Sequence, residues 1–342
     1  MNIIPLFIPH AGCKTRCIFC NEYSATGLPN FPEFEKLYDV AVKYHGYFKD
    51  KTNVEIAFYG GTFTGLPIEV MAAYLEFSMR FIREGYAKAI RFSTSPEEIT
   101  SEKLSLLSRY PISLIEVGVQ SFDKDVLKAS RRPHDVNDVY NATKLLKSFD
   151  MPFGMHLMTG LPYDTEEKDL ISAIEVAQLG ASTCRIHPAV VLKGTALEEM
   201  YLRGEYKPQS LENALEITWK MYVILTSKGI KVNRMGLCLY GDTVKEVVAG
   251  PYHPAFGDLA KSKVALEILR LISSKNSSRK LLLPDNAKYR QFFTGYKRYV
   301  VDNLQKEGIT LEFSKKDSLA VDIDKYIDDL CERVTANMGV FR

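Results

Sequence analysis

The sequence lacks most features of a secreted, membrane-bound or strongly charged protein. Only six of its 342 residues are cysteine, so a disulfide framework is not expected. No segment stays apolar for the roughly eighteen residues that a membrane-spanning helix needs, and the N-terminus has no basic stretch followed by a small-residue cleavage site. The formal net charge is only +2, without a basic tail. We therefore expect a cytoplasmic protein without a membrane segment, and composition alone does not require a nucleic-acid partner.

A glycine-rich G-x-G-x-x-G turn, which would indicate a dinucleotide-binding sheet, is also missing after the first apolar segment. The sequence instead has a regular series of short apolar segments. After a first segment that ends near Ile8, the segments expected to be strands are 54–59, 89–94, 114–119, 153–158, 184–191 and, as a seventh, 230–237.

Helical patterns separate these apolar segments. We predict helices over 34–48, 66–83, 136–149, 165–180 and 210–228. Ser95, followed by Pro96 and then by Glu98, has the pattern of a capping box and predicts another helix start. Short apolar strands that alternate with helices form parallel β/α units with right-handed crossovers. The sequence therefore predicts an α/β fold, a partial (β/α) barrel of TIM type with about six parallel strands, over residues 1–245.

The pattern changes after residue 245. Strands are expected at 280–283, 310–313 and 319–323, with a helix near Lys261, a long helix from Asn286 and a final helix, so residues 246–342 predict a small α+β domain. Aromatic residues recur at helical spacing in the long helix and predict a buried face rather than a base-stacking platform. These aromatic residues are Tyr289, Phe292, Phe293, Tyr296 and Tyr299. The basic residues between them, Lys288, Arg290, Lys297 and Arg298, are expected on the solvated face.

Half of the cysteines lie together after the first predicted strand. Cys13, Cys17 and Cys20 have C-x3-C-x2-C spacing, so their thiolates can converge on an iron-sulfur cluster or a zinc ion. A 4Fe-4S cluster held by three thiolates leaves one iron open for a cofactor or substrate. The alternative is a zinc site in which His10 supplies the fourth ligand.

Polar residues stand at the ends of the other predicted strands. In β/α barrels catalytic groups lie at the carboxyl ends of the strands, so these residues are expected at one mouth. The glycines among them allow either a close approach of a ligand or a tight turn, and Ser95 also has the helix-cap interpretation. The residues are Gly60, Gly61, Thr62, Ser93, Ser95, Gln120, His156, Arg185 and His187, with Arg132 before the helix at 136.

With these motifs in place, residues 1 to about 240 resemble the radical S-adenosylmethionine (SAM) enzymes. Residues 58–66, 117–123 and 156–165 are similar to both oxygen-independent coproporphyrinogen oxidase and the radical SAM domain of the Elongator catalytic subunit. Residues 185–188, 192–195 and 203–208 resemble the Elongator group, as does the segment after Gly250.

The resemblance implies a 4Fe-4S cluster held by Cys13, Cys17 and Cys20, SAM on its open iron, and a 5'-deoxyadenosyl radical that abstracts hydrogen from a substrate. It implies cofactor contacts from Phe19, Gly60, Gly61, Thr62, Ser93, Ser95, Gln120, Arg132 and Arg185. His156 and His187 are candidate substrate contacts. A flavodoxin or ferredoxin is the expected electron donor, and RNA is a candidate substrate. The alternatives are a zinc-stapled RNA-binding or interaction protein and a coproporphyrinogen oxidase-like enzyme.

Overall fold

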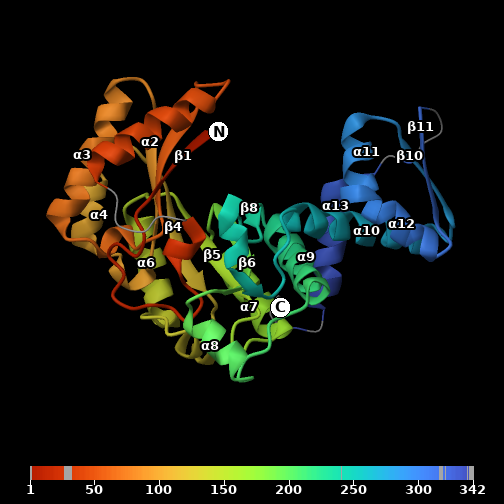
Figure 1. Ribbon diagram of the computed structural model, residues 1–342. Coiled ribbons are helices and arrows are strands. Elements are labelled where there is room, and N and C mark those ends of the chain that lie inside the picture. Colours follow the sequence, from red (N-terminus) through yellow and green to blue (C-terminus); the bar gives the residue numbers. More distant parts are fainter. Residues whose placement is uncertain are drawn as a thin grey trace.

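The computed structural model describes residues 2–26, 33–239, 241–315, 319, 321–336 and 338. Within these residues, seven parallel strands form one sheet in the order in which they occur in the chain (Figure 1). The strands are β1 (Asn2–Phe7), β2 (Val54–Tyr59), β3 (Ala89–Thr94), β4 (Ile112–Gln120), β5 (Phe153–Thr159), β6 (Thr183–Pro188) and β8 (Lys231–Met235). The sheet curls with β1 and β8 as its two edges, which confirms the predicted partial barrel. The expected seventh strand is β8.

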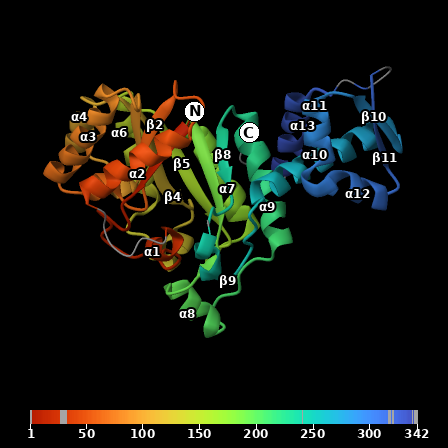
Figure 2. The same cartoon turned by 45° about the horizontal axis from the view of Figure 1, so that its top comes forward.

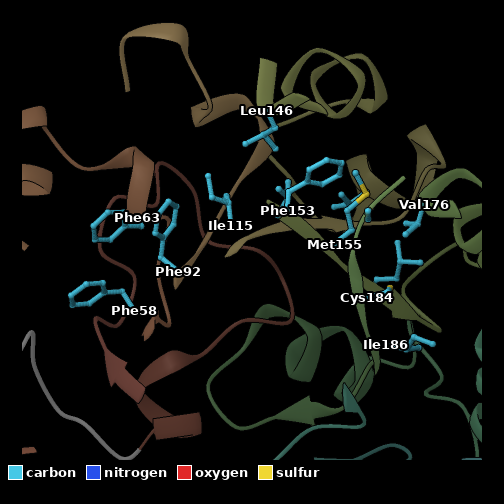
Figure 3. Close-up of a cluster of buried hydrophobic side chains, with 14 of the residues drawn as sticks. Phe58, Phe63, Phe92, Ile115, Leu146, Phe153, Met155, Val176, Cys184 and Ile186 are labelled. Atoms are coloured by element: carbon cyan, nitrogen blue, oxygen red, sulfur yellow. The ribbon is translucent and has the colours of Figure 1, made fainter. Parts of the chain in front are cut away.

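Helices follow the strands and cover the outer face of the sheet. They are α2 (Phe34–Tyr47), α3 (Ile68–Arg83), α4 (Ser101–Leu107), α5 (Lys124–Ala129), α6 (Val136–Ser148), α7 (Glu166–Gln178) and α9 (Leu211–Ser227). Figure 3 shows the apolar core between sheet and helices, with Phe92, Ile115, Phe153 and Met155 from three strands and Leu146 from α6. Because side chains alternate along a strand, the residues between these apolar positions face the inside of the barrel.

Short elements lie beyond the carboxyl ends of the strands. They are α1 (Glu22–Thr26), β7 (Val191–Leu192), α8 (Ala196–Leu202) and β9 (Val247–Ala249), and β7 pairs with β9 in antiparallel fashion. Three-residue 3-10 turns occur at η1 (Phe63–Gly65) and η2 (Pro96–Glu98), with a longer one at η3 (Gly241–Glu246). Figure 2 shows α1, α8 and β9 gathered at this end of the sheet.

The predicted helix start at Ser95 is wrong. Pro96–Glu98 forms only a 3-10 turn, and α4 begins at Ser101 with Thr100 as its cap. The Ser95 side chain caps no backbone N–H, because its hydroxyl bonds other side chains: it donates to Glu97 at 2.5 Å and accepts from Arg132 at 3.0 Å.

The C-terminal part of the chain forms a separate lobe in Figures 1 and 2. Its elements are α10 (Phe256–Asn276), β10 (Lys280–Pro284), α11 (Ala287–Thr294), η4 (Tyr296–Arg298), α12 (Tyr299–Lys306), β11 (Thr310–Ser314) and α13 (Ile323–Thr335). A second apolar cluster fills this lobe and includes Trp219 and Val223 of α9. The lobe combines helices with a two-stranded sheet, as predicted, and its strands β10 and β11 pair in parallel. The division of the chain at residue 245 stays a prediction.

Two details of this lobe differ from the prediction. The expected long helix from Asn286 is broken at Gly295, and Lys297 and Arg298 have positive φ angles of 46° and 67°. In the segment predicted as a third strand, residues 319, 321 and 322 belong to no strand and Ile323 begins α13, while residue 320 lies outside the described residues. The aromatic face is buried or half-buried and the four basic residues between its members are exposed, as predicted.

Across the described ranges, no helix is both long and apolar enough to cross a membrane.

Candidate functional site

The cysteine loop is hydrogen-bonded to the end of β2. His10 donates its backbone N–H to the carbonyl of Gly60 at 2.7 Å, and Thr62 donates to the carbonyl of Ala11 at 2.8 Å. Gly12 has φ +71°, and a Cβ at this position would lie 2.2 Å from the Thr62 carbonyl oxygen. Only glycine therefore allows this close contact, which fixes the loop that carries the three cysteines.

Each cysteine sulfur has one polar neighbour from this mouth. Cys13 Sγ lies 3.3 Å from Thr62 Oγ1, Arg132 Nη1 donates to Cys17 Sγ at 3.0 Å, and Cys20 Sγ lies 3.9 Å from Glu22 Oε1. Burial raises the pKa of Cys20 well above its usual range, and the Glu22 carboxylate adds to this effect. Burial also raises the pKa of Cys13, against the hydrogen bond from Thr62. The three thiols are free, so they remain available as ligands.

His10 has another role in this loop. Its Nε2 accepts the backbone N–H of Glu22 at 3.2 Å, and its ring packs edge-on against Tyr23 with centroids 5.1 Å apart. In the described part of the chain, no three His, Cys, Asp or Glu side chains are close enough to hold one metal ion. A zinc ion needs four ligand atoms within about 2.3 Å of one point, whereas a 4Fe-4S cluster binds each thiolate to a different iron. Thiolates are the donors that an iron-sulfur cluster takes, so the chemistry of the three cysteines fits the cluster.

Replacing His10 by alanine is expected to leave the iron content of the reconstituted protein unchanged, because its Nε2 accepts the backbone N–H of Glu22 and its ring packs against Tyr23. Iron and acid-labile sulfide would be measured after anaerobic reconstitution, with His253→Ala as a matched histidine control outside the loop. Loss of most of the metal only in the His10 variant would make His10 a ligand.

The glycine pair after β2 faces the cysteine loop. A Cβ on Gly61 would lie 2.6 Å from the Ala11 carbonyl oxygen and 2.8 Å from that of Ile8, and one on Gly60 would lie 3.0 Å from Glu22 Oε2. Both glycines therefore permit the chain's own loop to approach β2. Their predicted contact with a cofactor stays a prediction.

Arg132 gathers several predicted residues at the end of β4. Its Nη2 donates to Ser95 Oγ at 3.0 Å and to the Gly118 carbonyl at 2.6 Å, while its buried Nε has no partner in the described residues. A Cβ on Gly118 would lie 3.1 Å from Gln120 Nε2 and 3.5 Å from Arg132 Nη2, so these two side chains lie over the same glycine. Gln120, Arg132 and Ser95 are thus brought together, as expected of groups that bind one ligand.

The remaining predicted contacts line the mouth less closely. Ser93 is half-buried near the end of β3, and its hydroxyl lies 3.4 Å from the Gly61 carbonyl oxygen. Phe19 is half-buried and packs against two small apolar clusters, one containing Leu197 and the other Leu161. It anchors the cysteine loop to α8 and to the loop after β5.

Arg185, His156 and His187 lie deeper, on the inner face of the sheet. Arg185 donates to Tyr59 Oη at 2.8 Å and pairs with Glu116 Oε1 at 2.7 Å. His156 Nε2 lies 3.4 Å from Glu116 Oε1, and the two histidine rings are 6.0 Å apart. Burial lowers the pKa of both histidines, so both are neutral at pH 7, and His187 Nε2 is buried without a partner among the described residues.

The sequence interpretation missed the charged residues that organise this inner face. Arg91 lies between the carboxylates of Glu55 and Glu116, with N–O distances of 3.3 Å to each, and all three side chains are buried. Burial alone would raise the pKa of Glu116, but His156, Arg185 and Arg91 lower it well below its usual range. The available signal was one charged residue in the middle of each of three apolar strands.

Two recesses involve the C-terminal lobe, and one of them lies between this lobe and helices α7 and α9 of the barrel. The larger is a groove of about 1060 Å³ between α10, α11 and the start of α13, lined by Tyr222, Lys261, Lys288, Tyr289 and Phe292 among others. It contains none of the predicted site residues, so it is separate from the cysteine loop.

Two models of known protein families match the sequence. The sequence model of the radical SAM superfamily matches residues 7–174, and that of the radical SAM C-terminal domain matches residues 181–267. A tRNA uridine(34) acetyltransferase of Methanocaldococcus infernus is 28% identical over 184 residues, 48% of this chain and 34% of that protein. An uncharacterized protein of Methanocaldococcus jannaschii is 31% identical over 205 residues, 56% of this chain and 61% of that protein.

The solved structure of Methanocaldococcus infernus Elp3 with an N-terminal deletion has the same fold. It superposes with a TM-score of 0.63 at 21% identity, over 81% of this chain and 63% of that one. The chain thus spans between about a third and two thirds of the length of these relatives. The two family matches, which together cover most of the barrel, show that the chain belongs to the radical SAM superfamily and is an enzyme whose cofactors are a 4Fe-4S cluster and S-adenosylmethionine.

Proposed function

We propose that Cys13, Cys17 and Cys20 hold the cluster and that the enzyme acts on a group in RNA. The observation that carries the first half is the loop of three free thiols, which follows β1 at the open end of the barrel. When bound, the reduced cluster supplies the electron that cleaves SAM into methionine and a 5'-deoxyadenosyl radical, which abstracts hydrogen from the substrate. The second half rests on the relatives, of which one is named for its action on uridine(34) of tRNA.

The chain's own residues then have to orient SAM and exclude water. Arg132 has one buried donor without a partner, Nε, and Gln120 lies beside it, so this pair is suited to a carboxylate such as that of the methionine moiety. Thr62, Ser93 and Ser95 offer hydroxyls around it, and Gly60 and Gly61 keep β2 close to the cysteine loop. Phe19 supplies an apolar wall. Cofactor contacts by these residues are part of the proposal.

The inner face of the barrel is the proposed place of the reacting group. Glu55, Arg91, Glu116 and Arg185 carry two negative and two positive charges, so this layer is neutral as a whole. His156, which contacts Glu116, and His187 are neutral, and the unpaired His187 Nε2 is the group we expect to meet the substrate. A neutral, hydrogen-bonding group such as a nucleobase fits this surface better than an anion.

The test is an anaerobic assay of the reconstituted holoenzyme. With SAM and a one-electron donor, either flavodoxin, ferredoxin or dithionite, the enzyme should release 5'-deoxyadenosine, and unmodified tRNA should increase the amount formed. A reduced porphyrinogen serves as the competing substrate. Iron-loaded protein that binds SAM but forms no 5'-deoxyadenosine would overturn the reaction, and stimulation by the porphyrinogen rather than by tRNA would overturn the substrate.

A further inference from the structure

Tyr163 is held in a strained backbone conformation at the mouth of the barrel. Its φ is +64°, a region that bulky L-residues rarely adopt, and its side chain is 75% exposed. It follows β5 by four residues, in the loop whose Leu161 packs with Phe19 of the cysteine loop. A strained residue of this kind persists only where its surroundings fix it, and such residues cluster at functional sites.

Several contacts fix this loop. Lys168 Nζ donates to the Tyr163 carbonyl at 2.9 Å and also pairs with Asp123 at 3.2 Å. Asp164 donates its backbone N–H to the Leu161 carbonyl at 3.0 Å. Below the loop, the Asp164 carboxyl contacts the buried carboxyl of Asp169, and burial raises the pKa of both. Tyr206 donates its hydroxyl to the carbonyl of Gly160 at 2.7 Å. These contacts hold the backbone of the loop, and Tyr163 projects from it exposed.

Neighbouring loops at this mouth carry cations that form no ion pair in the part of the chain that the structure describes. The exposed side chains are Lys128, Arg131, Lys193 and Lys207. Backbone contacts bring their segments together: Ile18 of the cysteine loop donates to the carbonyl of Ser130 at 3.2 Å and accepts from Leu197 at 2.8 Å. The exposed carboxylates on the flanking helices α5, α7 and α8 are Asp125, Glu166, Glu167 and Glu199. Glu166 pairs with Lys220 and Glu199 with Arg203, so two unpaired carboxylates stand against the four unpaired cations in the described residues.

From this arrangement we infer that Tyr163 is a stacking platform for one base of a single-stranded RNA segment whose phosphates bind the surrounding cations. An aromatic face offered beside unpaired lysine and arginine side chains is the chemistry that binds single-stranded nucleic acid. The inference rests on the proposed RNA substrate and adds the surface by which RNA is held next to the cysteine loop. Tyr163 is a positioning residue, because it lies outside the inner face where the reaction is proposed.

The test measures binding without reductant, so it does not depend on turnover. In the reconstituted protein, Tyr163→Trp places a fluorescent tryptophan at the platform. The single native tryptophan, Trp219, is only 5% exposed, so a ligand in solution should hardly affect its fluorescence. An unstructured oligouridylate should quench the new emission. The control is Tyr47→Trp, because Tyr47 is 67% exposed at the end of α2, just before β2 starts, and so lies at the opposite end of the barrel. Its emission should not change.

Affinity gives the second measurement. Tyr163→Ala should weaken oligouridylate binding by about tenfold, which is the usual effect of losing one stacked base, while Tyr163→Phe should bind as the parent does. Equal affinities for the alanine variant and the parent, together with unquenched Tyr163→Trp emission, would overturn the platform. Failure to bind oligouridylate at all would also overturn it. Loss of 5'-deoxyadenosine formation would instead be a failure of the proposed reaction, which these binding measurements do not use.

Discussion

Cys17→Ala is expected to lose its cluster and with it all SAM cleavage. The cysteine loop carries three thiols, those of Cys13, Cys17 and Cys20, and two thiolates cannot hold a 4Fe-4S cluster stably. After anaerobic reconstitution, the iron content should fall from about four per chain to below about one. The broad absorption of the cluster in the visible range and the release of 5'-deoxyadenosine should disappear together.

The fold should survive this change, because Cys17 is half-buried on a loop and is not part of the apolar core. Far-UV circular dichroism should match that of the parent. Cys331→Ala is the matched control, since Cys331 lies on α13 in the C-terminal lobe, and it should keep full iron and activity. A Cys17 variant that retains four irons, or that loses its secondary structure, would contradict the assignment of Cys17 as a ligand.

Local patterns were sufficient to predict most of the fold. The strands β2 to β6 lie where the apolar segments predicted them, because each segment carries enough apolar residues to bury one face of the strand against the helices. The order of the sheet follows from short, right-handed connections, which leave sequential neighbours side by side. The three cysteines could be identified as candidate ligands because their C-x3-C-x2-C spacing is a local sequence pattern.

Features that depend on distant residues could not be predicted in this way. Ser95 has the sequence pattern of a helix cap, yet Arg132, 37 residues further along the chain, bonds its hydroxyl. The helix from Asn286 keeps its aromatic periodicity through Gly295, but packing of the aromatic side chains on α9 and α10 decides where it breaks. The partners of Glu116 depend on the register of β4 with β3 and β5, which the sequence of β4 alone does not give.

The second large effect is expected at Glu116, in the charged layer on the inner face of the barrel. Glu116 is 1% exposed and contacts the guanidinium groups of both Arg91 and Arg185, so Glu116→Leu leaves two buried cations with one carboxylate, Glu55. Removing one partner of a buried ion pair costs about 3–5 kcal/mol. The free energy of unfolding, measured by urea denaturation of the metal-free protein at pH 7, should fall by this amount.

The effect should depend on pH in a defined direction. Because the pKa of Glu116 is lowered in the folded state, its carboxylate stabilises the fold above its ordinary pKa of 4.5, and this contribution is lost as the pH falls below that value. The difference between parent and variant should therefore shrink in acid. Glu312→Leu is the control, since Glu312 pairs with Lys280 at 2.8 Å on the surface, where such a pair contributes at most about 1 kcal/mol. Equal losses in the two variants would mean that the inner layer is solvated and does not hold the strands together.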